Sequence, residues 1–187
     1  AISKRTNGRL VGLRLAMFSG FSAGVLFSYV TNAAFILIDF FKLSKVQFSI
    51  AFGLMILTFM IGNRITVHLL KNHAAPKIVD RINLVQLFVT LAMITLCFFT
   101  TPTLWQVMMG ISFILGCHGA TSPAASGYFI SLYDKNVGSA SSLNSTLVFA
   151  FGGLIGGLSA LLSQGQLTPI FIVMFVSSAI ARVCLKT

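Results

Sequence analysis

Long apolar runs recur along the whole sequence and constrain its fold more than any other feature. They lie near residues 12–38, 46–66, 82–101, 103–132, 137–163 and 167–185. Each is about as long as the ~20 residues with which a helix crosses the hydrocarbon core of a bilayer. Only 9% of the residues are charged, whereas a soluble domain carries roughly 25%. The sequence therefore predicts an all-α membrane protein, with a basic tail or linker at 1–11 and a bundle of six transmembrane helices at 12–187.

The first apolar run follows several basic residues, as the apolar part of a signal peptide does. It extends from Leu15 to Ile38, well beyond the roughly 7–15 apolar residues of a signal peptide. We therefore interpret it as a spanning helix. Because the chain begins at Ala1 rather than at methionine, we expect it to be processed, excised or part of a longer protein.

The net charge of +10 is compatible with nucleic-acid binding, but the charges lie in the gaps between the apolar runs. We therefore expect no nucleic-acid partner and interpret the charge as a guide to orientation. With the N-terminus inside, only Lys42 and Lys45 face outward. The segments that face inward hold Lys4, Arg5, Arg9, Arg14, Arg64, Lys71, Lys77, Arg81, Lys135, Arg182 and Lys186. Short cytoplasmic loops are enriched in Lys and Arg, so both termini are predicted to be cytoplasmic, with the basic tail suited to anionic lipid head groups.

The sequence favours neither a metal site nor an enzyme. Cys97, Cys117 and Cys184 have no paired spacing, so we expect small inert thiols rather than disulfides or zinc ligands, and we predict no cofactor. His118 and Ser122 are one helical turn apart, but no nucleophile-elbow sequence surrounds the serine. We therefore do not expect an intramembrane hydrolase.

Glycine divides the predicted helices into two kinds, and the division repeats after three helices. The runs at 82–101 and 167–185 contain no glycine, whereas the other four do. Small residues mark places where membrane helices pack closely. An odd-numbered repeat reverses the direction of the chain, so the two triplets are expected to be inverted copies, as in one six-helix half of a secondary transporter.

The leading helix of each triplet is interrupted at a matching place. Asn32 and Pro123 each lie about 20 residues into their helix, and such interruptions point to a transporter binding site. The alternative is coincidence, because proline kinks are common in membrane helices.

Polar and aromatic residues form a stripe on the first helix, because Phe18, Ser22, Val25, Tyr29 and Asn32 alternate at three- and four-residue spacing. The stripe is either a cavity wall for an amphipathic ligand or a seam of hydrogen bonds between helices. In the fourth helix, His118 is either functional, as intramembrane ionisable residues usually are, or a neutral side chain bonded to a neighbouring hydroxyl or carbonyl. The candidate substrate-binding residues are Phe18, Ser22, Tyr29, Asn32, His118 and Ser122.

The fifth helix contains two overlapping GxxxG pairs, Gly152/Gly156 and Gly153/Gly157. Such pairs let helices approach closely, either for sliding during transport or for static packing. Asn144 is placed to bond across the same interface. The candidate packing or gating residues are Pro123, Gly138, Asn144, Gly152, Gly153, Gly156 and Gly157.

Two stretches resemble one family. Residues 20–65 resemble helices seven and eight of the Bcr/CflA drug-resistance branch of the major facilitator superfamily, and "KLSKVQFS" at 42–49 is similar to that branch's loop "GLSPQQFG". Residues 122–143, "SPAASGYFISLYDKNVGSASSL", resemble the end of helix ten and the start of helix eleven. In them Pro123 matches a proline near the end of helix ten, and Gly138 to Leu143 match a "GTASAL"-like run.

The resemblance implies the C-terminal half of a twelve-helix antiporter in the bacterial inner membrane, which exchanges amphipathic drugs for protons. Its partner would be an N-terminal six-helix half, in the same or a separate chain. The first helix of each triplet would line the cavity, the second would lie between the halves, and the third would face lipid.

Two departures from the family bear on transport by this chain alone. The loop at 62–78 keeps only Asn63-Arg64 of the superfamily's charged motif, with no acid nearby, and the half that typically holds the proton-binding carboxylate is missing. The sequence has no Glu, and its Asp residues lie at helix ends or in loops, so a proton site lies elsewhere or is His118. The alternative is a non-transporting six-helix protein, which would be a regulatory or assembly partner or a truncated remnant.

Overall fold

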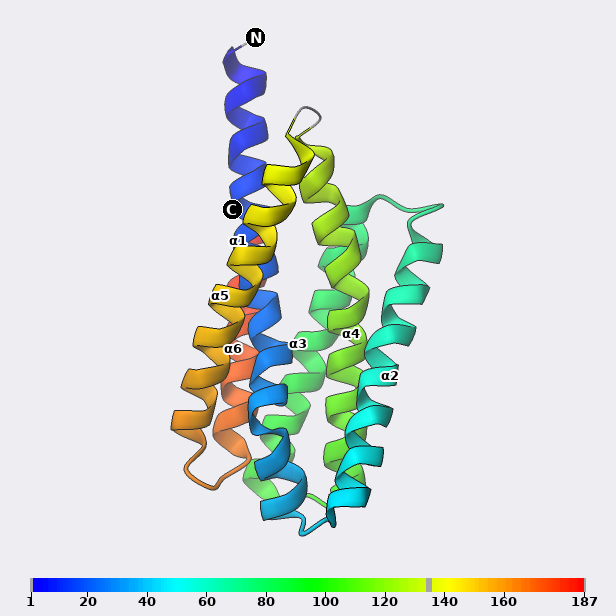
Figure 1. Cartoon of the computed structure of the whole chain (residues 1–187), viewed down its shortest axis with the longest axis vertical. Coiled ribbons are helices and arrows are strands. Elements are labelled where there is room, and N and C mark those ends of the chain that lie inside the picture. The colour runs from blue at the N-terminus through cyan, green and yellow to red at the C-terminus, as the bar shows by residue number, and fades with distance from the viewer. Residues whose placement is uncertain (1, 134–135, 187) are drawn as a thin grey trace.

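The computed structural model describes residues 2–133 and 136–186, with side chains in the first helix described from Leu10 onward. These residues form six α-helices that run side by side, alternately up and down, and include no strand (Figure 1). The helices are α1 (Ile2–Ala34), α2 (Lys45–Leu69), α3 (Ala75–Phe99), α4 (Leu104–Ser131), α5 (Val137–Ser163) and α6 (Thr168–Lys186). The all-α prediction is confirmed for the described chain.

Five of the described helices are long and apolar enough to cross a membrane. These segments are Leu10–Phe40, Lys45–Leu69, Ala75–Phe99, Val137–Ser163 and Thr168–Lys186. The chain is therefore a multi-pass membrane protein by length and composition. The exception, α4, carries the buried polar residues His118 and Thr121 among its 12 buried positions. Where protein covers this helix, its side chains need not match the apolarity of lipid.

Two helices begin earlier than the apolar runs indicate. α1 starts at Ile2, so the predicted tail at 2–11 is helical, and α3 starts at Ala75 rather than near residue 82. Pro76 lies in the first turn of α3, where its missing N–H has no helical partner to lose. α1 continues into a π-helical turn, η1 (Phe35–Phe40). α2 then opens with a capping box formed by Ser44 and Gln47.

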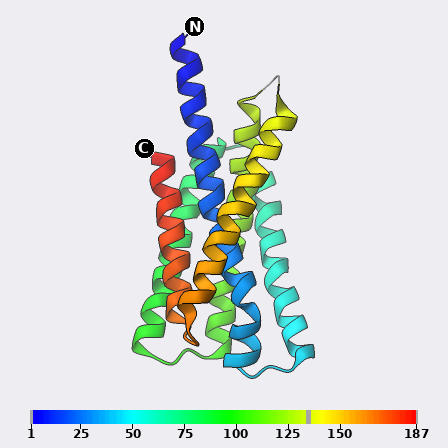
Figure 2. The same ribbon diagram turned by 60° about the vertical axis from the view of Figure 1, so that its left-hand side comes forward.

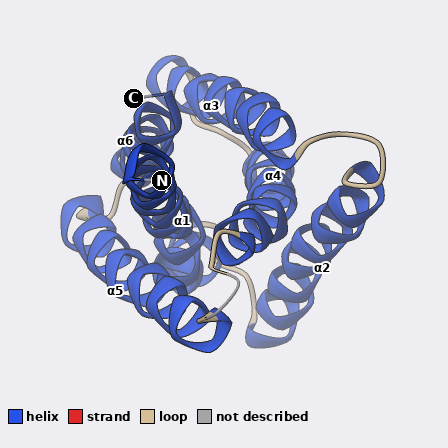
Figure 3. Ribbon diagram, turned by 90° about the horizontal axis from the view of Figure 1, so that it is seen from above, coloured by secondary structure: helices blue, strands red, loops and turns tan. Residues whose placement is uncertain are grey.

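The helices pack as two crossed groups. α1 packs mainly on α5 and α6, whereas α4 packs mainly on α2 and α3. Contacts of α1 with α4 and of α3 with α6 join the two groups into one bundle (Figure 3). In Figure 2, α5 crosses directly over α1. The main core lies inside this bundle and contains Tyr29, Ile36, Ile111 and Phe171.

Glycines mark the closest crossing between α2 and α4. A Cβ added at Gly62 would collide with the carbonyl oxygen of Gly116, and one added at Gly119 would collide with that of Phe59. Both obstacles are backbone atoms, which have little room to move. The two helices therefore touch backbone to backbone, as small residues allow in membranes.

Glycines also shape the crossing of α5 over α1, but only one of the two GxxxG pairs takes part. Gly152 lies against the ring of Phe27, and Gly156 against the Phe27 carbonyl and the Thr31 hydroxyl. Gly153 and Gly157 face open space, as does Gly138.

Basic residues are divided between the two ends of the bundle. Both termini and the α2–α3 connection, which contains Lys71 and His73, lie at one end (Figure 1). Lys42 and Lys45 lie at the η1–α2 connection, at the opposite end. Lys135, one of the predicted cytoplasmic residues, lies outside the described residues.

Candidate functional site

A pocket of about 200 Å³ lies where α1, α2, α4 and α5 meet. Four of the six predicted substrate-binding residues line it, namely Phe18 and Ser22 from α1 and His118 and Ser122 from α4. Sequence positions about 100 residues apart thus meet because α1 and α4 cross at this level. The remaining walls include Phe59 from α2 and Phe149 from α5.

The polar centre of the pocket is a pair of side chains from α1 and α4. Ser22 Oγ lies 3.0 Å from His118 Nδ1, and both residues are buried. The His118 ring also lies against the ring of Phe59, with 5.8 Å between the centroids. One nitrogen of the imidazole therefore has a hydroxyl partner, as the interpretation of a hydrogen-bonded histidine requires.

A second polar contact joins α5 to α4 beside the same pocket. Asn144 Nδ2 donates to Ser126 Oγ at 3.3 Å, and Ser126 lines the pocket one turn beyond Ser122. Pro123 lies within α4 between these two serines. Asn144 thus bonds to α4, whereas the pair Gly152/Gly156, with which it was expected to share an interface, packs on α1.

The pocket retains unused hydrogen-bonding capacity. Ser19 Oγ is buried in the pocket wall and has no hydrogen-bond partner among the described residues. Asn144 Oδ1, which does not line the pocket but belongs to the side chain that contacts Ser126, is also buried without a partner among the described residues. Because unpaired polar atoms are costly away from water, a ligand or water with polar groups would be stabilised here.

The other two predicted substrate-binding residues lie elsewhere. The Tyr29 ring stacks on Phe52 of α2 with 5.7 Å between centroids, within the main core. Asn32 Nδ2 donates to Ser28 O at 2.8 Å and to Ser159 Oγ of α5 at 3.1 Å. The residues of the stripe on α1 therefore lie in two different places. Its first half lines the pocket, and its second half holds helices together.

Several residues of this site were missed by the sequence reasoning. Ser19 and Ser126 line the pocket, and the four-residue spacing of Ser122 and Ser126 is a signal that could have found the latter. Phe59 and Phe149 carry no such signal, because phenylalanine is frequent throughout the chain. Their place in the pocket depends on how α2 and α5 cross the leading helices.

The lining of the pocket is largely apolar. Aromatic and aliphatic side chains form most of its surface, with hydroxyls and one imidazole as the polar groups. No Asp or Glu lines it in the described part of the chain, and no group of three or more His, Cys, Asp or Glu is placed there to hold a metal ion. Such walls suit an amphipathic molecule held by few directional contacts.

Comparisons of the chain with protein-family models, with curated proteins and with solved structures find no match.

Proposed function

We propose that this chain is one six-helix half of a membrane transporter of the Bcr/CflA type in the major facilitator superfamily. It would export amphipathic drugs or other small molecules in exchange for protons. The observation that carries the proposal is the pocket in which Ser22 and His118 meet, because it lies between the leading helices α1 and α4 and is flanked by α2 and α5. These are the helices that the resemblance assigns to the cavity and to the interface between halves.

The packing pattern supports two inverted three-helix repeats. The leading helix of each triplet packs on the second and third helices of the other triplet: α1 on α5 and α6, α4 on α2 and α3. A pseudo-two-fold axis between α1 and α4 would produce this exchange. In this proposal α4 is the sixth spanning helix, since its connections to α3 and α5 lie at opposite ends of the bundle (Figure 1).

The size and setting of the pocket support a half rather than a complete transporter. Its volume of about 200 Å³ is below the roughly 300–1,000 Å³ of small-molecule sites. The helices that flank it are largely uncovered. Only 22% of the apolar 18-residue stretch of α2 and 17% of that of α5 is buried. A second six-helix half on this face would complete the pocket and cover Gly153 and Gly157. We infer that this half comes from the same or a separate chain.

The proposed orientation places both termini in the cytoplasm of a bacterium, with the bundle in the inner membrane. It is supported by the α2–α3 connection, which contains Lys71 and lies at the end that holds the termini, and by Lys77 in the first turn of α3 beside it. Protons would be exchanged through a carboxylate of the missing half or through His118.

Efflux of ethidium from energised cells that lack their major pumps tests the proposal. The chain would be expressed alone and together with a six-helix segment encoded upstream of it. We expect efflux only from the pair, abolished by a protonophore. Efflux from the chain alone would show that it assembles a complete carrier by self-association. No efflux of ethidium or of a wider panel of amphipathic substrates from either form would favour the regulatory or assembly partner instead.

A further inference from the structure

Two neighbouring pockets on the α2–α3 side of the bundle meet at one residue, Ile82. The first, of about 310 Å³, is a groove between α2 and α3 with α4 as its floor. The second, of about 290 Å³, lies beside the α2–α3 connection. Both are lined by Ile82, so together they form one continuous surface, which we call the α2–α3 groove. It does not contain Ser22 or His118 and is separate from the proposed transport pocket.

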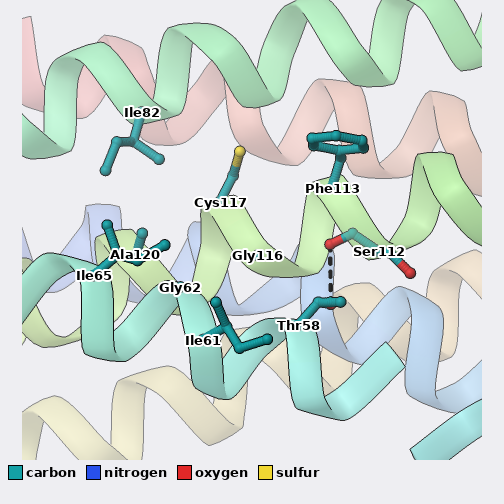
Figure 4. Close-up of a pocket in the computed structure, with 10 residues that line it drawn as sticks. All are labelled: Thr58, Ile61, Gly62, Ile65, Ile82, Ser112, Phe113, Gly116, Cys117 and Ala120. Carbon is teal, nitrogen blue, oxygen red and sulfur yellow. Dashed lines mark hydrogen bonds between the residues drawn. The ribbon is translucent and has the colours of Figure 1, made fainter. Parts of the chain in front are cut away.

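The deep part of the α2–α3 groove is apolar. Ile61 and Ile65 of α2, Phe113 and Cys117 of α4 and Ile82 of α3 surround the space (Figure 4). Its one polar contact is internal, because the Thr58 hydroxyl lies 2.6 Å from Met55 O and 3.1 Å from Ser112 O. A hydrocarbon chain can therefore pack in this part of the groove, whereas a polar ligand would find few hydrogen-bonding partners there.

The mouth of the α2–α3 groove is basic. His73, Lys77 and Arg81 line it together with Leu69 and Ile78. Lys77 and Arg81 are exposed and make no ion pair within the described ranges. The neighbouring Asp80 is engaged instead by Arg182 of α6, with 3.0 Å between Nη2 and Oδ1. Two positive side chains at this mouth are thus left for an external anion.

The depth of these residues matches the layers of a bilayer. α3 has 25 residues and is about 37 Å long, longer than the ~30 Å hydrocarbon core. The excess of about 7 Å corresponds to about five residues, which is enough to bring the first turn, with Lys77, to head-group level. Arg81 lies one turn deeper, and its long side chain extends toward that level. The apolar part of the groove lies deeper, beside the acyl chains.

We propose that an anionic phospholipid occupies the α2–α3 groove. Lys77 and Arg81 bind its phosphate, and one acyl chain lies between α2 and α3 against Phe113 and Cys117. Basic pockets between membrane helices bind anionic head groups in this manner. The proposal does not depend on transport, because it requires only that α2 and α3 span the membrane.

Native mass spectrometry of the purified full chain in detergent tests the head-group contact. We expect phosphatidylglycerol to bind more tightly than phosphatidylcholine with the same acyl chains. The double variant Lys77→Gln/Arg81→Gln should weaken phosphatidylglycerol binding about 25-fold, or about fivefold per charge. It should weaken phosphatidylcholine binding by a much smaller factor, because the choline cation offsets the charge of the phosphate. Lys42→Gln/Lys45→Gln is the matched control at the opposite end. Equal binding of the two lipids, or an equal loss in the control, would overturn the proposal.

A second experiment locates the acyl chain without a variant. Phosphatidylglycerol with a diazirine in one acyl chain is photoreacted with the wild-type chain in lipid nanodiscs, and the labelled peptides are identified. Labels on Ile61, Ile65, Phe113 or Cys117 support the proposal, and labels spread evenly over α5 and α6 contradict it. Millimolar inorganic phosphate should leave the labelling intact. Complete displacement by phosphate would mean that the mouth binds a free anion and not a lipid.

Discussion

Ser22 of α1 and His118 of α4 are joined by a 3.0 Å contact between Oγ and Nδ1, although 96 residues separate them in the chain. Both side chains are buried, so neither has lipid or bulk water as an alternative partner. The contact thus ties together the two helices that lead the proposed repeats, at the level of the pocket.

Removing the hydroxyl of Ser22 should destabilise the bundle. Ser22→Ala leaves the His118 imidazole without this partner, and a buried polar group left unsatisfied costs about 1–3 kcal/mol. We expect a lower free energy of unfolding of that size, measured by thermal or denaturant unfolding in detergent. Ser22→Thr keeps a hydroxyl at this position and is the control. An alanine variant as stable as the wild type would show that the contact contributes nothing.

Replacing His118 tests its part in proton exchange. Glutamine keeps hydrogen-bonding groups but does not ionise, so His118→Gln should change the pH dependence of efflux if the imidazole exchanges protons during transport. The measurement is ethidium efflux by the assembled transporter over pH 5 to 8, which is about the range in which histidine changes charge. An unchanged pH profile would assign His118 a structural role only.

A methyl group at Gly62 should disrupt the crossing of α2 and α4. The added Cβ would collide with the backbone of Gly116, so we expect Gly62→Ala to lower the free energy of unfolding by about 1–3 kcal/mol. Gly53 lies on the same helix and faces open space. Gly53→Ala is therefore predicted to raise stability by roughly 0.5–1 kcal/mol, since alanine favours the helix. A Gly62→Ala variant at least as stable as the wild type would show that the crossing tolerates separation.

Substitutions in the two GxxxG pairs of α5 should distinguish an effect on folding from an effect on assembly. Gly156 lies against Phe27 and Thr31, whereas Gly157 faces open space. Gly156→Val should destabilise the isolated chain by at least about 1 kcal/mol. Gly157→Val should leave its unfolding almost unchanged. In the proposed transporter, Gly157→Val should instead impair association with the other six-helix half, measured by co-purification. Unimpaired association would place the second half on a different face.

The hydropathy of the sequence predicted the helices well, and their ends less well. Apolar runs report the part of a helix that lies in lipid, but backbone hydrogen bonding continues past that boundary. For this reason α3 starts at Ala75, with Pro76 as a start signal that the apolar run does not include. The third helix of each triplet is expected to face lipid, but α3 also buries the polar residues Asn83, Gln86 and Thr90 on one face.

The site was predicted only in part. Local spacing determines which residues share a face of a helix, but it does not determine which other helices that face contacts. Spacing placed Phe18, Ser22, Tyr29 and Asn32 on one face of α1, and all four are buried. Helices cross at angles, so this face meets α4 at Ser22 and α5 at Asn32. The GxxxG pairs pose the same difficulty, because adjacent registers on α5 are equivalent in sequence and only packing distinguishes Gly156 from Gly157.

The order in which the helices are synthesised gives α1 a particular difficulty. Its apolar segment is 56% buried, more than that of the other four apolar spans, yet its main partners are α5 and α6. The Asn32 amide gains its partner Ser159 only after 127 more residues have been synthesised, which takes about ten seconds at ordinary rates of translation. Until then the polar side chains of α1 face lipid, where they are poorly tolerated. We therefore expect α1 to need an insertase or a neighbouring helix beside it during synthesis until α5 has entered the membrane.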